Sequence, residues 1–142
     1  MGINTGKVIT GGLAAGVVMN VFDFVTNTYI MAERFKTEMD ALNPALMPKM
    51  METSTTITFV ALDFVYGLLL VLTYAAIRPR FGAGVGTAIK TALLVWTIAG
   101  TTWYFTTAMG MISMGAFAMM SVISLVTFLA AAYVGAMLYK ED

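Results

Sequence analysis

Four segments of the sequence are each long enough and apolar enough to cross a lipid bilayer as a helix. The bilayer core is about 30 Å thick and requires about 20 mainly apolar residues in helical form. Of all residues, 59% are hydrophobic and only 11% are charged, whereas soluble domains carry about 25% charged residues. We therefore expect an all-α, polytopic membrane protein in which residues 1–142 form a single four-transmembrane-helix bundle. The expected spans are residues 8–31, 56–77, 87–109 and 116–138, and the second is expected to stop at Arg78-Pro79-Arg80.

Basic residues predict the orientation of these spans, since cytoplasmic loops carry an excess of Lys and Arg. An even number of spans places both termini on one side of the membrane. That side would hold Lys7, Arg78, Arg80, Lys90 and Lys140. The other side would hold Arg34, Lys36 and Lys49, diluted by Glu33, Glu38, Asp40 and Glu52. We therefore expect both termini in the cytoplasm.

The long loop after the first span has a helical pattern of its own. Phe35, Met39 and Leu42 recur at helical spacing among charged residues, which is typical of an amphipathic helix lying on a membrane surface. Pro44 and Pro48 follow and should end it. The alternative is a solvated loop with incidental apolar residues.

The absence of Cys and His narrows the chemistry that the chain can perform. Without them there is no disulfide, thiolate nucleophile, imidazole base or imidazole metal ligand. Equal numbers of acidic and basic residues give no electrostatic signal for nucleic acid. We expect no enzymatic activity, no cofactor and no nucleic-acid partner. Two alternatives remain, and we favour packing and interface anchoring over both: Cu(I) binding by loop methionines, and a pigment or quinone pocket around Trp96, Trp103, Tyr104 and Tyr139.

Small residues mark the helix faces that should pack together. Small side chains let transmembrane helices approach closely, and polar side chains can hydrogen-bond across the contact. Gly12 and Gly16 form such a pair, which would serve packing within the chain or between two copies. The expected packing glycines are Gly12, Gly16, Gly67, Gly100 and Gly135.

Two acidic residues lie inside the expected spans at matching depths. Asp23 and Asp63 each begin an Asp-Phe-Val string, about 10–12 Å below the outer boundary at 1.5 Å per residue. A buried Asp costs about 2.5–3.5 kcal/mol even on translocon scales, so we expect the pair to hold a proton or a hard cation. The alternatives are protonated acids that hold helices together through Asn and Tyr, or acids that face a partner subunit. Expected neighbours in this site are Asn20, Asn27, Tyr66, Thr101, Tyr104 and Ser124.

Three stretches carry a resemblance to a known family. They are Gly11-Gly12-Leu13-Ala14-Ala15-Gly16, then Asn20 with Asp23-Phe24 and Asn27, and then Tyr74-Ala75-Ala76-Ile77-Arg78-Pro79-Arg80-Phe81-Gly82. The chain resembles an uncharacterised family of small bacterial four-span integral membrane proteins. Relatives often have Glu in place of Asp23 and Pro in place of Ala83. The resemblance implies four spans in a bacterial cell membrane, and it implies no activity.

These observations lead to two functional hypotheses. The first is a non-enzymatic membrane protein whose polar intramembrane site binds a small ligand, a proton or a hard cation, as a transporter built from several subunits would. The second is an accessory subunit that packs against a larger membrane complex. The expected partners are therefore the lipid bilayer, further copies of the chain, or another membrane protein.

Overall fold

The computed structural model describes residues 2–140, and within that range the chain forms only helices and connecting turns. This confirms the all-α class. The helical elements are α1 (Thr5–Val25), a π-helical turn η1 (Thr26–Ile30), α2 (Ala32–Leu42), α3 (Leu46–Met50), α4 (Thr53–Phe81), α5 (Val85–Ala108) and α6 (Met114–Leu138).

Three helical segments are long and apolar enough to cross a membrane. They are Thr5–Ile30, Thr53–Phe81 and Met114–Leu138. The fourth long helix, α5, has 24 residues, but Lys90 and a series of threonines make it more polar than the other three. Length and composition therefore identify a membrane protein with three candidate spans, one fewer than the sequence pattern predicts.

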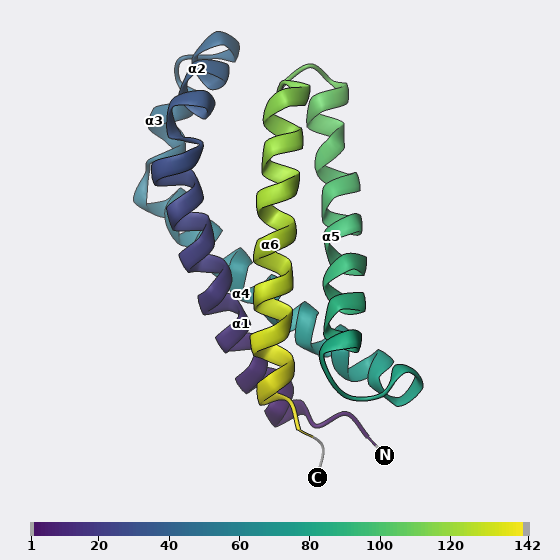
Figure 1. Cartoon of the computed structure of the whole chain (residues 1–142). Coiled ribbons are helices and arrows are strands. Elements are labelled where there is room, and N and C mark those ends of the chain that lie inside the picture. The colour runs from purple at the N-terminus through teal and green to yellow at the C-terminus, as the bar shows by residue number, and fades with distance from the viewer. Residues whose placement is uncertain (1, 141–142) are drawn as a thin grey trace.

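The long helices do not form the regular bundle that the sequence predicts. Figure 1 shows α5 and α6 side by side and antiparallel, with α1 along the half of α6 near the chain termini. α4 runs obliquely behind α1 and α6 and packs most extensively against α1. The start of α1 and the end of α6 share one end of the molecule, which we call the terminal end. The opposite end carries α2, and we call it the α2 end.

Glycines set how closely α1 approaches α4. A Cβ on Gly16 would lie 2.8 Å from the Phe64 Cα, and one on Gly67 would lie 2.5 Å from the Gly16 nitrogen. Gly12 meets α4 in the same way, since a Cβ there would lie 2.8 Å from the Leu68 Cα. Only glycine permits these backbones to touch, so the contact draws α1 and α4 together.

The other two expected packing glycines behave differently from each other. Gly135 on α6 faces α1, where a Cβ would lie 3.3 Å from the Gly11 carbonyl oxygen and 3.4 Å from the Ala15 Cβ. Gly100 differs from the expectation, because no atom lies within 4 Å of where its Cβ would be. Gly100 borders the space between α5 and α6, and no close helix contact at this position supports its expected packing role.

Helix ends follow local signals, with one exception. Asn4 and Ser113 cap α1 and α6, since each side-chain oxygen accepts a hydrogen bond from a backbone N–H three residues ahead. The exception is Pro79, which was expected to stop α4. The helix continues through Pro79 to Phe81 and ends at Gly82, whose φ of +82° is in the left-handed region. Pro79 removes one backbone hydrogen bond. Because it lies two residues before the end of α4, this loss does not break the helix.

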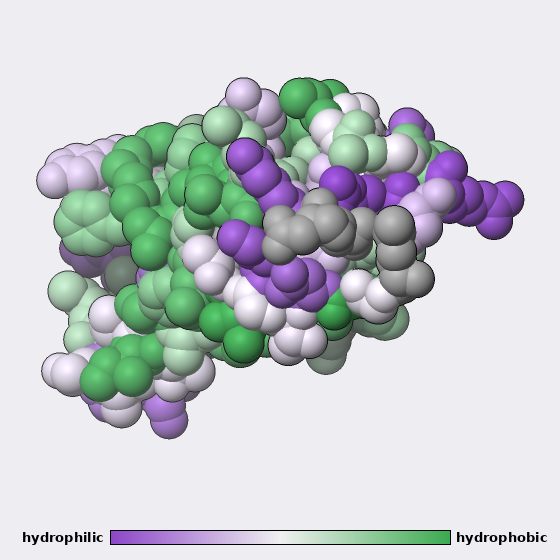
Figure 2. All heavy atoms as spheres, turned by 90° about the horizontal axis from the view of Figure 1, so that it is seen from below, coloured by the Kyte–Doolittle hydropathy of each residue, from purple (hydrophilic) through white to green (hydrophobic). Residues whose placement is uncertain are grey.

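The surface is hydrophilic around the chain termini and hydrophobic along the flanks of the long helices. Figure 2, which views the terminal end, shows hydrophilic side chains around the chain termini and hydrophobic ones over much of the rest. Large apolar residues of the long helices are exposed along the flanks, for example Phe105 at 67% and Val122 at 66%. Exposed apolar flanks are what lipid contact requires.

The expected amphipathic helix is present as α2, and its apolar face packs on the protein. Phe35 and Met39 pack against a small core made of Met31, Ile112 and Ala116. Leu42 was expected on the same face but is 43% exposed. Part of the face that was expected to meet lipid therefore contacts the beginning of α6.

Candidate functional site

The residues predicted to share one polar site fall into two groups. Asn20, Asp23 and Asp63 lie on α1 and α4, whereas Thr101 and Tyr104 lie on α5 and Ser124 lies on α6. The prediction assumed that all polar helix faces point to one centre. Because α4 crosses obliquely and α5 packs along α6 instead, two separate polar regions result.

Asp63 is covered where α1 meets α4. Only 8% of the residue is exposed, and it precedes Gly67 by one helical turn on the face that α1 approaches. Asp23 on α1 is exposed, yet it lies close enough to Asp63 for the two carboxylates to interact electrostatically. Within residues 2–140, no Lys or Arg forms an ion pair with either acid and no side chain donates a hydrogen bond to Asp63.

The amides near the two acids bind backbone instead of carboxylate. The Asn20 Nδ2 donates to the Gly16 carbonyl at 2.9 Å and to the Val60 carbonyl on α4 at 3.4 Å. The Asn27 Nδ2, in the π-helical turn, donates to the backbone carbonyl of Asp23 at 2.9 Å. Within residues 2–140, neither amide donates to the Asp23 or Asp63 carboxylate, so the structure does not contain the Asn–carboxylate hydrogen bonds that the structural alternative requires. Asn20 instead links α1 to α4.

Tyr66 contributes packing rather than a ligand group. Its ring meets Phe128 of α6 edge-on, with centroids 5.8 Å apart. Such contacts stabilise a helix interface by about 0.5–1.5 kcal/mol beyond buried area.

Few groups could hold a metal ion. No cluster of three or more acidic residues occurs in the described part of the chain. A pair of carboxylates suits a proton, or a hard cation completed by neutral oxygens.

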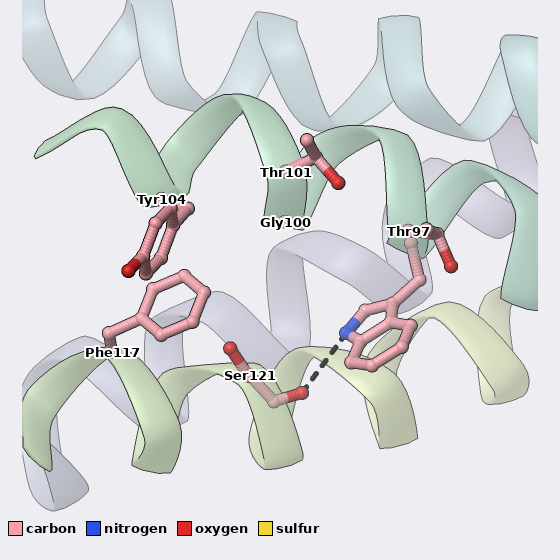
Figure 3. Close-up of a pocket in the computed structure, with 7 residues that line it drawn as sticks. Thr97, Gly100, Thr101, Tyr104, Phe117 and Ser121 are labelled. Carbon is pink, nitrogen blue, oxygen red and sulfur yellow. Dashed lines mark hydrogen bonds between the residues drawn. The ribbon is translucent and has the colours of Figure 1, made fainter. Parts of the chain in front are cut away.

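The second polar region is a groove of about 380 Å³ between α5 and α6 (Figure 3), which we call the α5–α6 groove. The Trp96 Nε1 closes one part of it by donating to the Ser121 carbonyl at 3.0 Å and to the Ser124 Oγ at 3.2 Å. The sequence prediction missed Phe117 as a lining residue, and it considered Trp96 only in the disfavoured alternative of a pigment or quinone pocket. The sequence contained a signal for Trp96. Trp normally lies at membrane interfaces, whereas Trp96 lies midway along α5, so its position in the middle of an expected span is unusual. The lining residues are Trp96, Thr97, Gly100, Thr101, Tyr104, Phe117 and Ser121.

A third polar feature, the Glu38–Ser113 clasp, joins α2 to α6 at the α2 end. The Ser113 backbone N–H and hydroxyl both donate to the Glu38 carboxylate, at 3.1 and 2.5 Å. Arg34 adds a 3.4 Å ion pair with Glu38. The hydrogen bond from the Ser113 hydroxyl is the main reason why the pKa of Glu38 lies below its ordinary value. The carboxylate also lies at a helix N-terminus, which favours negative charge.

Comparison with known proteins adds no assignment. No family model, curated protein or solved structure matches the chain. The resemblance to four-span bacterial proteins therefore stays a prediction, and function is argued from the geometry alone.

Proposed function

We propose that the chain is a non-enzymatic, multi-pass membrane protein that binds a proton or a hard cation at Asp63, with Asp23 as the second carboxylate. The observation that carries the proposal is an acid covered inside an apolar helix contact, beside a second acid and with no basic partner among the described residues. Intramembrane acids mark ion and proton pathways by default.

The position of the chain ends favours four crossings over three. Three crossings would place the start of α1 and the end of α6 on opposite sides of the membrane. Both lie at the terminal end, where the Asn4 backbone N–H donates to the Tyr139 hydroxyl at 3.3 Å. α5 packs along α6 and exposes Ile98 at 59%. These features support α5 as a fourth, more polar crossing.

Charge supports a cytoplasmic terminal end. Lys7, Arg80 and Lys140 are exposed on the segments that reach it, and loops rich in Lys and Arg stay in the cytoplasm. A bacterial cell membrane fits the resemblance noted in the sequence. α2 would then lie on the outer side.

The carboxylate chemistry favours light, hard ions. A charged Asp inside a bilayer costs about 2.5–3.5 kcal/mol on translocon scales, so an empty, fully ionised pair is unfavourable. A proton, sodium or calcium removes that cost with oxygen ligands alone. Movement of such an ion across the membrane would make the chain a subunit of a transporter.

A second candidate function, an accessory or self-associating subunit, is favoured by one observation. Asp23 is exposed at span depth, and polar side chains at that depth normally face protein or water rather than lipid. A second copy of the chain or another membrane protein would cover it. Size measurement of the complex in mild detergent separates this candidate from an isolated monomer.

Thermal unfolding of the purified protein in detergent tests the ion site. Sodium or calcium, compared with choline, should raise the melting temperature of the parent protein more at pH 9 than at pH 5, because protons compete for the same carboxylate. Asp63→Asn should remove this response. Asp40→Asn, which changes an exposed acid of α2, should retain it. An Asp63→Asn variant that responds like the parent would rule out Asp63 as the ligand.

A further inference from the structure

Four basic side chains form one exposed surface at the terminal end of the molecule. Figure 1 shows the start of α1, the α4–α5 turn and the end of α6 at this end. Each of these three places carries at least one exposed basic residue. We call the set the basic surface, and its members are Lys7, Arg80, Lys90 and Lys140. None of the four forms an ion pair with another residue in the described range 2–140.

No acidic residue of the described chain lies near enough to neutralise the basic surface. Residues 2–22 and 64–140 contain no Asp or Glu. Asp23 lies on α1 with Lys7, and Asp63 lies on α4 with Arg80. At 1.5 Å per residue, each acid is about 25 Å from the basic residue of its own helix. This distance is about three times the Debye length of about 8 Å in physiological salt, so the positive charge of the surface is left to attract a partner.

The charge of the terminal end stays positive when the whole sequence is counted. Glu141 and Asp142 follow Lys140 and lie outside the described residues. With both included, the segments at this end carry five basic side chains (the basic surface and Arg78) and two acidic ones, a net charge of +3. The loop at the α2 end, residues 32–52, carries three basic and four acidic side chains, a net charge of −1. The surplus of positive charge therefore belongs to the terminal end.

Lys90 contributes to the basic surface although it belongs to the second turn of α5. It lies five residues after Val85, about 8 Å along the helix from the first residue. Its Nζ lies 5.3 Å from the centroid of the Phe81 ring at the end of α4. Long basic side chains extend along apolar surface and keep their charge in water. The charge of Lys90 therefore lies at the α4–α5 turn, where Arg80 also lies.

Arg78 is not part of the basic surface, because it packs within the protein. Its Cζ lies 5.7 Å from the centroid of the Tyr139 ring, and Tyr139 is buried. The Tyr139 hydroxyl in turn accepts the hydrogen bond from the Asn4 backbone N–H. These contacts join the end of α4 to the start of α1 and the end of α6. Arg78 therefore has a structural role, and the four exposed residues are the ones that meet a partner.

Exposed apolar side chains adjoin the basic surface and define the kind of partner that fits. Phe81, Val85 and Met137 are exposed on the same helix ends, and Figure 2 shows hydrophobic side chains next to the hydrophilic ones at this end. A nucleic acid or an acidic soluble protein would match the charge and leave the apolar residues uncovered. A phospholipid matches both, because its phosphate is joined through glycerol to acyl chains.

We infer that the basic surface binds the headgroups of anionic glycerophospholipids, such as phosphatidylglycerol, in the leaflet at the terminal end. The ammonium and guanidinium groups pair with the lipid phosphates, and the adjoining apolar side chains contact the acyl chains. Phosphatidylcholine has the same phosphate, but its own choline group neutralises that charge, so it binds less well. The inference requires that the long helices cross the membrane, and it is independent of the ion site at Asp63.

Native mass spectrometry of the protein released from detergent micelles provides the test. With phosphatidylglycerol and phosphatidylcholine of the same acyl chains at equal concentration, the parent should retain mainly phosphatidylglycerol. Arg80→Gln combined with Lys90→Gln should reduce this preference about fivefold for each charge removed, as expected for a basic residue at an anionic membrane surface. Arg80→Lys, which keeps the charge, should bind like the parent. Circular dichroism of each variant verifies that its helices are intact.

A matched control separates the basic surface from the overall charge of the protein. Lys36→Gln combined with Lys49→Gln removes the same charge from exposed residues at the α2 end, and it should keep the preference of the parent. Excess glycerol 3-phosphate, which has the phosphate without acyl chains, should not displace phosphatidylglycerol.

Four results would each overturn the inference. Equal retention of the two lipids by the parent would show no selection for negative charge. An unchanged preference after removal of the Arg80 and Lys90 charges would show that lipid binds elsewhere. An equal loss in the control at Lys36 and Lys49 would assign the preference to overall charge. Displacement by glycerol 3-phosphate would show a site for a soluble phosphate instead of a lipid.

Discussion

Replacement of Gly67 by Ala tests the contact that brings α1 and α4 together. The added methyl group would meet the Gly12 carbonyl oxygen and would lie 2.5 Å from the Gly16 nitrogen. Both atoms belong to the backbone, so no side-chain rotation can relieve the overlap and the helices must separate. Overpacking of this kind costs about 1–3 kcal/mol.

A matched variant isolates the overlap from the intrinsic preference of Ala for helices. Ala is favoured over Gly in a helix by about 1 kcal/mol, so Gly86→Ala, which meets nothing within 4 Å, should be slightly more stable than the parent. Because both variants gain this helix preference, they should differ by the overlap alone, about 1–3 kcal/mol in free energy of unfolding. Circular dichroism during titration of the detergent-solubilised protein with sodium dodecyl sulfate measures the difference. Equal stability of the two variants would refute the close approach of α1 and α4.

Two further predictions concern the α2 end and the orientation. The pKa of Glu38 is lowered from 4.5 in the folded protein, chiefly by the hydrogen bond from Ser113. The Glu38–Ser113 clasp therefore stabilises the fold fully above about pH 4.5, and this contribution disappears as the pH falls through the lower pKa of the folded state. Glu38→Gln should flatten this dependence when the melting temperature is measured across acidic pH, and an unchanged dependence would contradict the clasp. Single cysteines replacing Asp40 or Gly110 should react with a membrane-impermeant maleimide on intact cells, and one replacing Lys7 should not; the opposite pattern would reverse the proposed orientation.

Features that depend on a short stretch of chain could be predicted from the sequence. Long apolar runs predict the long helices, and the spacing of Phe35 and Met39 predicts α2. The π-helical turn after Val25 has no comparable local pattern. The predicted end of α4 at Pro79 was wrong, although proline is a strong helix-ending signal. The helix ends instead at Gly82, three residues later, where φ is positive.

The composition of the site could be predicted only in part, because it depends on how helices cross. Periodicity places Asp23 and Asp63 on faces that meet, and in the structure the two acids are near enough to interact electrostatically. The same periodicity assigns Thr101 and Tyr104 to a polar face of α5, but it cannot tell which helix that face meets. In the structure α4 packs most extensively against α1, and α5 packs along α6, so Thr101 and Tyr104 lie beside α6 instead of beside the two acids.

The pairing of α1 with α6 has a consequence for biosynthesis. α1 leaves the ribosome before α6, which begins about 110 residues later in the chain. At about 5–20 residues per second, the surface of α1 around Gly11 and Ala15 waits roughly 5–20 s for the helix that covers it. During that interval the nascent chain exposes a narrow strip of small residues on α1, and the contact between α1 and α6 cannot form until α6 has been synthesised.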